Sequence, residues 1–213
     1  MFRNRLDGRE AFGSRPSNLD LGKMKRGLSP ETEYEVMEAT REELGQGGLS
    51  GLTLDRVAER ADEGETVYEY YDSAVELATA FVEYERDRFE EFLMVTADEP
   101  DLRLRALLDV TVDLVDIEDD DLVPAYLEMY AMATEHERLR EALLKFDAAI
   151  REALTETIRD GIEDGTFEEV DPQAAADMIF AAHMSTFLRK AVGGETGGIK
   201  DGLDEFILSA FRK

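Results

Sequence analysis

The chain has 213 residues, of which 50 are Asp or Glu and 24 are Lys or Arg, so its formal net charge is -26. It contains no cysteine, which excludes disulfide bonds, a thiol nucleophile and zinc sites built on thiolates. Hydrophobic residues make up 43% of the chain. This is enough for a globular core, so the acidity predicts a charged surface over folded helices rather than an acidic tail.

Lysine is scarce and occurs only at positions 23, 25, 145, 190, 200 and 213. An acidic, lysine-poor surface suits a cytosol of molar salt, because screening relieves the self-repulsion of the charges. We therefore expect a halophilic source, such as a halophilic archaeon; an ordinary acidic mesophilic protein is the alternative. No apolar run reaches the roughly 18 residues that span a bilayer, and the N-terminus lacks a signal-peptide core. These features predict a cytoplasmic protein without a membrane partner.

Residues 1–28 form the one basic stretch of the chain, a predicted flexible arm. Its cations lie among Gly, Ser, Asn and Pro residues; they are Arg3, Arg5, Arg9, Arg15, Lys23, Lys25 and Arg26. The arm can contact a phosphate backbone, or it can be a disordered tail upstream of a true start at Met24. Both interpretations stay open.

Helical signals follow from Ser29, a predicted N-cap with Pro30 behind it. Glycines at 45, 47 and 48 are predicted to end this helix. Thr53 caps a short second helix, a tight turn occupies 61–64, and a third helix covers 65–71. The capping-box pattern at 73–76 then opens a long fourth helix.

Five more helices are predicted beyond residue 100 from apolar residues at three-to-four spacing. The clearest pattern runs from Leu139 to Ile162 and stops at Asp164 and Gly165, and Asp171 restarts the chain. A last helix is predicted around 203–211. No alternating pattern argues for a strand and no fixed repeat occurs, so the sequence predicts an all-α chain of about nine helices.

Two short helices joined by a tight turn, with a helix on either side, are typical of a helix-turn-helix. The segments LTLDRVAERA (52–61) and TVYEYYDS (66–73) resemble the N-terminal signature of the TetR family of transcriptional regulators. That signature has a threonine-capped helix with Ile-Ala, a turn, and then Thr-Leu-Tyr-x-x-Phe-x-Ser-Lys. The resemblance covers residues 29–84 by motif. It implies a DNA-binding domain at 29–75 and a helical ligand-binding and dimerisation domain at 76–213.

The resemblance also implies roles for single residues. Val57, Ala58, Val67 and Tyr71 would form the small core between the two short helices. Hydroxyl groups would donate to phosphates, and Glu could accept from cytosine N4. The residues expected at double-stranded DNA are Lys25, Arg26, Thr53, Glu65, Thr66, Tyr68, Glu69, Tyr70 and Ser73. The alternative for the tyrosines is that they only pack the domain.

Three departures from the TetR pattern concern this DNA-binding region. The turn is one residue shorter than usual and contains Asp62 and Glu63, the recognition helix has no basic residue, and Ala74 replaces the usual lysine. Carboxylates repel a phosphate backbone. A TetR-like dimer with impaired DNA binding that acts through protein partners is therefore the alternative function.

The same resemblance implies a homodimer on a palindromic operator and a small-molecule effector in the helical body. Aromatic and methionine side chains suit a mostly apolar ligand. The predicted ligand-binding residues are Met94, Tyr126, Met129, Tyr130, Phe146, His183, Met184 and Phe187. The predicted dimerisation residues are Ala175, Met178, Ile179, Ala182, Phe206, Ile207 and Phe211. For both sets, an ordinary core within one chain is the alternative.

An enzyme is not expected. A di-metal carboxylate bundle needs Glu-x-x-His on two helices, whereas neither His136 nor His183 has Glu three residues before it. No phosphate-binding glycine loop or nucleophile elbow occurs. The sequence therefore predicts no catalytic residue, no metal site and no cofactor.

Overall fold

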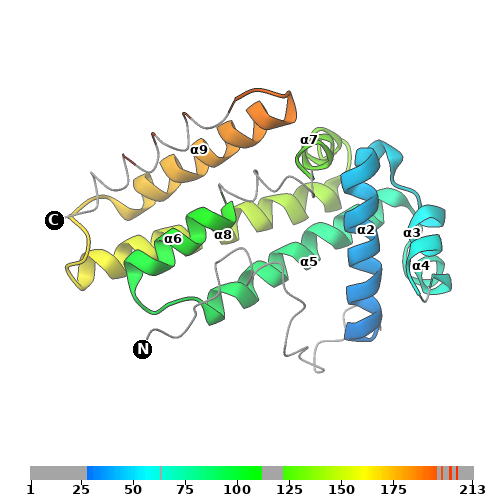
Figure 1. Cartoon of the computed structure of the whole chain (residues 1–213), viewed down its shortest axis with the longest axis horizontal. Coiled ribbons are helices and arrows are strands. Elements are labelled where there is room, and N and C mark those ends of the chain that lie inside the picture. Colours follow the sequence, from blue (N-terminus) through cyan, green and yellow to red (C-terminus); the bar gives the residue numbers. More distant parts are fainter. Residues whose placement is uncertain are drawn as a thin grey trace. The chain divides into compact units, whose positions relative to one another are not determined.

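The computed structural model describes residues 28–62, 64–111 and 122–195, with single helical positions at 198, 202 and 205. Every regular element with bounds in these ranges is an α-helix, which confirms the all-α prediction (Figure 1). The helices are α2 (Pro30–Gly51), α3 (Leu54–Arg60), α4 (Glu65–Tyr70), α5 (Ala74–Val95), α6 (Pro100–Thr111), α7 (Val123–Met132), α8 (Glu137–Glu163) and α9 (Pro172–Ala191). The predicted arm up to residue 27 lies outside the described ranges, as does the predicted helix at 203–211 except for the single helical position 205.

The predicted helix starts are confirmed by their caps. Ser29, Thr53, Ser73 and Asp171 each accept a hydrogen bond from a backbone N–H of the following turn, at 3.0 to 3.2 Å. The capping box is closed by Glu76, which accepts a hydrogen bond from the backbone N–H of Asp72 at 3.1 Å. Orphan N–H groups at these helix ends are thus satisfied locally, as the sequence pattern predicts.

The predicted end of the first helix is confirmed in part: the regular helix breaks at Gly48, but not at the other two glycines. The helix continues through the glycines at 45 and 47 to Gly51, interrupted only at Gly48, whose φ of 65° and ψ of -173° are not helical. A left-handed φ is unfavourable for residues with a Cβ but not for glycine. Gly48 therefore kinks the chain, and the residues after it form a further short turn that leads into α3.

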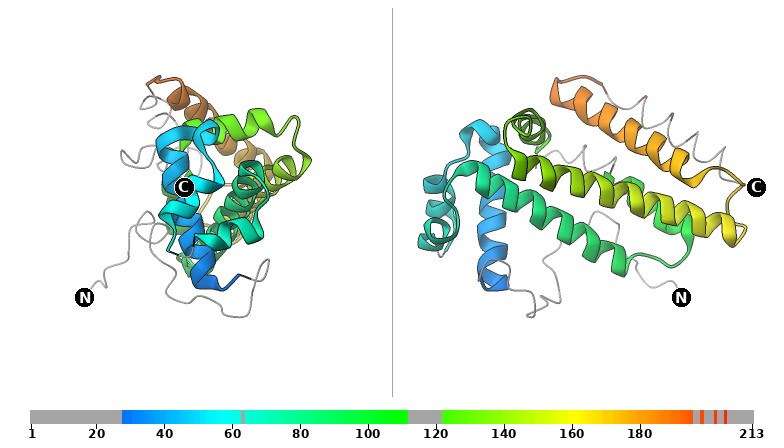
Figure 2. Two further views of the ribbon diagram at one scale, coloured as in Figure 1. Left: turned by 90° about the vertical axis from the view of Figure 1, so that its right-hand side faces the viewer. Right: turned by 180° about the vertical axis from the view of Figure 1, so that it is seen from behind.

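One compact unit contains, among the described residues, 28–62, 64–87 and 122–146; we call it the N-terminal unit. α2 packs against both α3 and α7. Its buried face, with Val36, Met37 and Leu44, joins a continuous hydrophobic core with residues of α5, α7 and α8. A partly buried ion pair also connects α2 to α5, because Arg41 Nη2 lies 2.5 Å from Glu85 Oε1. Figure 2 shows the helices from two further sides.

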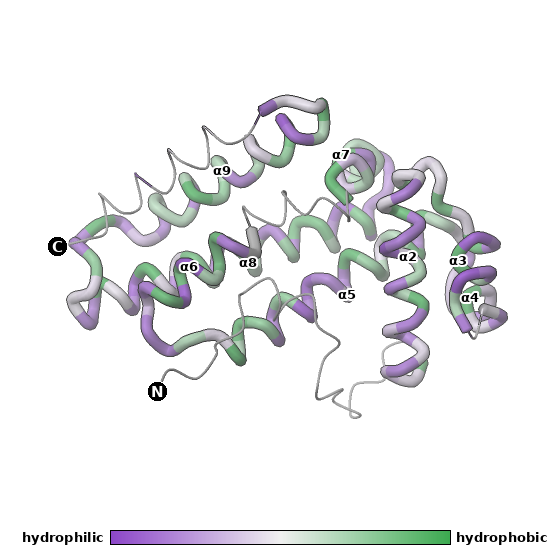
Figure 3. The backbone as a smooth tube through the Cα atoms, in the orientation of Figure 1, coloured by the Kyte–Doolittle hydropathy of each residue, from purple (hydrophilic) through white to green (hydrophobic). Residues whose placement is uncertain are grey.

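The second unit, which we call the body unit, contains residues 88–111 and 147–195 of the described chain. Leu107, Leu154, Ile158 and Ile179 are buried in it. Hydrophobic and hydrophilic segments follow one another along α8 (Figure 3). This agrees with the amphipathic helix that the sequence predicts. Arg103 of α6 donates a hydrogen bond to Thr157 Oγ1 of α8 at 3.0 Å. No helix in the described ranges is both long and apolar enough to cross a membrane.

Candidate nucleic-acid interface

The two short helices α3 and α4 have a core of their own. Val57 and Val67 are fully buried and Tyr71 is almost so, while Ala58 is partly buried against them, which confirms the predicted core. Gly64 permits the close turn between the helices, because a Cβ there would lie 1.9 Å from the carbonyl oxygen of Ala58. Together with α2, these helices form the tri-helical helix-turn-helix that the sequence predicts.

Most of the residues predicted at DNA lie on the surface of this module. Thr53, Glu65, Tyr68, Glu69 and Ser73 are exposed. Thr66 and Tyr70 are half-buried, and Tyr70 packs against the hydrophobic core. Lys25 and Arg26 lie outside the described ranges. The surface around α3 and α4 therefore presents hydroxyl and carboxylate groups to solvent. Thr66 and Tyr70 contribute less to it than the exposed residues do.

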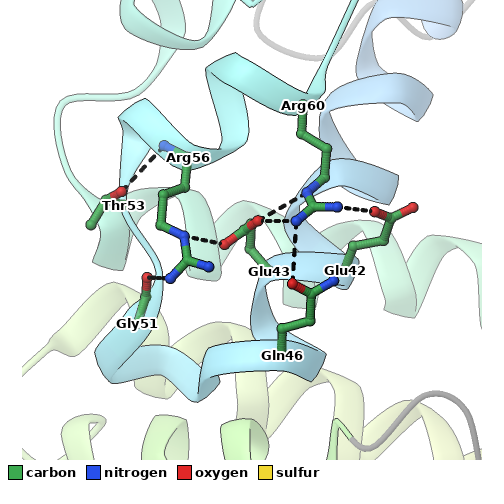
Figure 4. A network of polar contacts seen from close by, with 7 residues as sticks. All are labelled: Glu42, Glu43, Gln46, Gly51, Thr53, Arg56 and Arg60. Atoms are coloured by element: carbon green, nitrogen blue, oxygen red, sulfur yellow. Dashed lines mark hydrogen bonds and ion pairs between the residues drawn. The ribbon is translucent and has the colours of Figure 1, made fainter.

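A buried carboxylate on α2 pairs with both arginines of α3. The side chain of Glu43 is only 2% exposed. Its Oε2 lies 2.6 Å from Arg56 Nε, and its Oε1 accepts hydrogen bonds from Arg60, at 2.9 Å from Nε. Figure 4 shows both arginines turned toward this carboxylate. We call this set the Glu43 cluster; its residues are Glu42, Glu43, Gln46, Arg56 and Arg60.

The Glu43 cluster sets the charge of the interface. Arg56 and Arg60 are the only basic residues of α3 and α4, and both are paired with carboxylates, since Arg60 Nη1 also lies 2.6 Å from Glu42 Oε2. The hydrogen bonds that Arg60 donates to Glu43 raise the pKa of Arg60. Acidic residues surround them on the same module: Asp55, Glu59, Asp62, Glu65, Glu69 and Asp72. The surface of α3 and α4 is therefore acidic, and its two arginines are already paired with carboxylates of α2.

Sequence reasoning missed the role of Glu43. A signal was present, because Glu43 follows the buried Val36 by seven residues and Thr40 by three. It therefore lies on the apolar face of α2. A carboxylate on such a face requires cationic partners, since burial of an unpaired charge is costly.

Tyr68 of α4 is held by a carboxylate of α3. Its hydroxyl donates a hydrogen bond to Asp55 Oδ1 at 2.7 Å, although 52% of the tyrosine remains exposed. This hydrogen bond raises the pKa of Tyr68 above its ordinary value. The phenol therefore has a fixed position on the outer face of the recognition helix.

The connection between α2 and α3 is held from α7. The backbone N–H of Ser50 donates to Glu128 Oε2 at 2.7 Å, and Arg56 Nη1 donates to the carbonyl oxygen of Gly51 at 3.4 Å. Both contacts fall within the turn that follows the kink at Gly48. The start of α3 is thus attached both to α7 and to its own first turn.

Both the sequence and the fold are similar to those of known transcriptional regulators. Residues 100–184 match the C-terminal domain of BetI-type transcriptional repressors. A TetR transcription regulator from Haloarcula marismortui has a TM-score of 0.75 with 26% identity, over 85% of this chain and 99% of that one. The chain is therefore similar to TetR-type transcriptional regulators, in sequence over residues 100–184 and in fold over most of its length. No protein of curated function matches its sequence significantly.

Two more distant structures share the TetR fold. A regulator from Saccharomonospora viridis, in complex with choline, has a TM-score of 0.69 with 16% identity, over 86% of this chain and 98% of that one. The regulator FadR from Bacillus subtilis, in complex with stearoyl-CoA, has a TM-score of 0.58 with 17% identity, over 83% of this chain and 98% of that one. At these identities the likeness concerns the fold.

The ligand residues expected from the TetR resemblance divide between the two units. In the N-terminal unit, Met129 is fully buried, and Tyr126, Tyr130 and Phe146 pack partly buried against the core. The ring centroids of Tyr126 and Phe81 lie 6.5 Å apart. These four residues thus belong to one hydrophobic cluster, and their role toward a ligand stays a prediction.

The other four expected ligand residues lie in the body unit. His183 of α9 lies between two rings of its own helix, with centroids 6.0 Å from Phe180 and 6.4 Å from Phe187. Met184 is half-buried, and Met94 is 79% exposed. Across the described ranges no group of three or more His, Cys, Asp or Glu side chains could hold a metal ion.

The expected TetR dimer helix α9 exposes an apolar stripe. Met178, Leu188 and Val192 are 60%, 53% and 73% exposed, and Ala174, Ala181 and Ser185 complete the row at three-to-four spacing. Of the residues predicted for dimerisation, Ile179 is buried inside the body unit, and Ala175 and Ala182 are half-buried. Phe206, Ile207 and Phe211 lie outside the described ranges.

Proposed function

We propose that the chain binds double-stranded DNA through α3 and α4 and regulates transcription as a homodimer controlled by a small molecule. The observation that supports this most is the packing of α3 on α2 and of α4 on α3, with Thr53 and Tyr68 exposed at their surface. Capping uses a lone pair of the Thr53 hydroxyl, whose hydrogen can donate to a phosphate oxygen. DNA register would depend on such groups rather than on arginines.

High salt makes an acidic DNA-binding module workable. The Debye length is about 3 Å at 1 M salt, so repulsion between carboxylates and phosphates acts only at contact. The same salt removes the gain from counterion release that normally drives DNA binding. Short-range hydrogen bonds would then provide both affinity and specificity. The composition, with its scarce lysine and excess of acidic residues, supports such a halophilic setting.

The dimer would use the mainly apolar stripe along α9 and its C-cap, defined by Ala174, Met178, Ala181, Ser185, Leu188 and Val192. Its small residues allow close approach of a second helix, and its large ones are unusually exposed for a monomer surface. Ile179 serves the core of its own chain, so it would support the interface from behind. A two-fold axis would place the two α4 helices about one DNA turn, roughly 34 Å, apart and select a palindromic operator.

The effector would be a small, mostly apolar molecule bound in the C-terminal domain, which we place at residues 76–213 behind a DNA-binding domain at 29–75. Structures of the same fold hold choline and stearoyl-CoA. In this chain the aromatic and methionine residues Tyr126, Met129 and Tyr130 of the N-terminal unit would line its site.

Fluorescence anisotropy tests DNA binding directly. Labelled DNA from upstream of the coding sequence is titrated in molar potassium chloride with the wild type and with a Tyr68→Ala, Tyr70→Ala double variant. We expect at least roughly tenfold weaker binding by the variant, since each lost contact contributes about 1 kcal/mol or more. Equal affinities would exclude this DNA face. A stable dimer that binds no DNA would favour action through protein partners.

A further inference from the structure

The hydrogen bond between Tyr68 and Asp55 determines whether the phenol can act as a donor or as an acceptor toward DNA. A tyrosine hydroxyl has one hydrogen to donate and lone pairs to accept. Here the hydrogen is directed at Asp55 Oδ1, 2.7 Å away. A carboxylate accepts only, so the direction of this hydrogen bond is not ambiguous. What Tyr68 can offer to DNA is therefore its lone pairs.

The other exposed groups of α4 have the same polarity. Glu65 and Glu69 are exposed carboxylates on either side of Tyr68, and ionised carboxylates only accept hydrogen bonds. Phosphate oxygens are also acceptors, so they are poor partners for all three side chains. Thr53 differs, because its hydroxyl accepts from the Arg56 N–H at 3.2 Å and keeps a hydrogen to donate. The module thus separates a donor at the start of α3 from acceptors along α4.

We propose that Tyr68, oriented by Asp55, is a specificity-determining residue that accepts a hydrogen bond from the exocyclic amino group of adenine or cytosine in the major groove. Adenine N6 and cytosine N4 are the donors that base pairs present there, whereas guanine and thymine present O6, N7 and O4 acceptors. Asp55 is a positioning residue: it directs the phenol hydrogen away from the DNA. This inference rests on the proposed DNA-binding function.

Selection from random-sequence duplexes in molar potassium chloride tests this assignment. The full-length wild type is compared with Tyr68→Phe, with Asp55→Ala, and with Asp98→Ala as a control of equal charge change. Asp98 is exposed and lies in the body unit. At each selected adenine or cytosine, affinity is then measured with purine or 2-pyrimidinone, which lack the exocyclic amino group.

We expect one position of the half-site at which loss of the amino group weakens wild-type binding roughly tenfold. Tyr68→Phe should remove this effect. Asp55→Ala frees the phenol hydrogen, so guanine or thymine should become acceptable there, and Asp98→Ala should keep the wild-type preference. An Asp55→Ala variant that binds DNA with the wild-type preference at every position overturns the inference alone. A wild type that selects no DNA overturns the proposed function and this inference with it.

Discussion

Glu128 of α7 accepts a hydrogen bond from the backbone N–H of Ser50, at 2.7 Å, in the last turn of α2. Gly48 makes room for this contact, because a Cβ at that position would lie 2.7 Å from Glu128 Oε1. α7 also carries Tyr126 and Met129, two of the residues predicted at the ligand. A movement of α7 would therefore act directly on the chain that enters the DNA-binding helices.

Gly48→Ala should destabilise the fold by about 1–3 kcal/mol, because the φ of 65° strains a residue with a Cβ and the new methyl group meets the Glu128 carboxylate. Gly47→Ala is the matched control: its Cβ would have ordinary contact, 3.7 Å from Arg56 Nη1, and helical alanine is favoured by roughly 0.5–1 kcal/mol. Guanidinium chloride unfolding measures both. Equal effects of the two variants would contradict the assigned kink.

Glu128→Ala removes the acceptor of the Ser50 N–H, so amide hydrogen exchange at Ser50 should accelerate roughly tenfold, as expected for loss of a hydrogen bond of about 1 kcal/mol or more. Protection of Val57 in α3 reports on the module itself and should change much less. Native-state exchange followed by NMR separates the two amides. Unchanged exchange at Ser50 would show that α7 does not hold this turn.

Glu43→Gln should cost about 2 kcal/mol of the free energy of unfolding, because Arg56 and Arg60 lose a nearly buried charged acceptor. The exposed partner Glu42, 57% exposed, supplies the control: Glu42→Gln should change stability by less than about 1 kcal/mol. Thermal and denaturant unfolding give both values. Releasing the two arginines should also strengthen binding to random DNA at moderate salt, and a loss of binding would argue that the cluster orders α3 for DNA.

The pKa of Tyr68 is raised by its hydrogen bond to Asp55. The stability that this hydrogen bond contributes is therefore fully present below the ordinary tyrosine pKa of about 10. It is lost as pH rises through the raised pKa of Tyr68. The difference in ultraviolet absorbance between the wild type and Tyr68→Phe isolates this residue from the other tyrosines. Asp55→Asn should shift its titration toward lower pH. A titration that does not move would mean that Asp55 does not accept from the phenol.

Local patterns in the sequence predict most of the helices correctly. Caps such as Thr53 and Asp171 act on the nearest N–H groups, so their effect depends on residues only two or three positions away. Apolar spacing likewise identifies the buried faces of α2 and α8. The sequence predicts the break in α2 only to within three glycines, at 45, 47 and 48, because each of them is equally able to break a helix. Gly48 is the glycine that breaks the helix, and it is distinguished by its contact with Glu128, 80 positions later in the chain.

The candidate interface was predictable in its position but not in its electrostatics. The TetR-like motif locates Thr53 and Tyr68, since it is a contiguous pattern. The pairing of Glu43 with Arg60 and of Asp55 with Tyr68 joins different helices, and spacing along one helix cannot reveal it. The predicted division of the chain after residue 75, and the expected ligand residues, likewise depend on packing between distant segments and stay predictions.

Hydroxyl-radical footprinting of the upstream DNA in molar potassium chloride tests the central claim, DNA recognition by a dimer through α3 and α4. The wild type should protect two patches about one helical turn, roughly 10 base pairs, apart. They should lie on the two halves of an inverted repeat, and both should disappear with the Tyr68→Ala, Tyr70→Ala variant. A dimeric wild type that protects no DNA, or a variant that leaves both patches intact, would contradict the account.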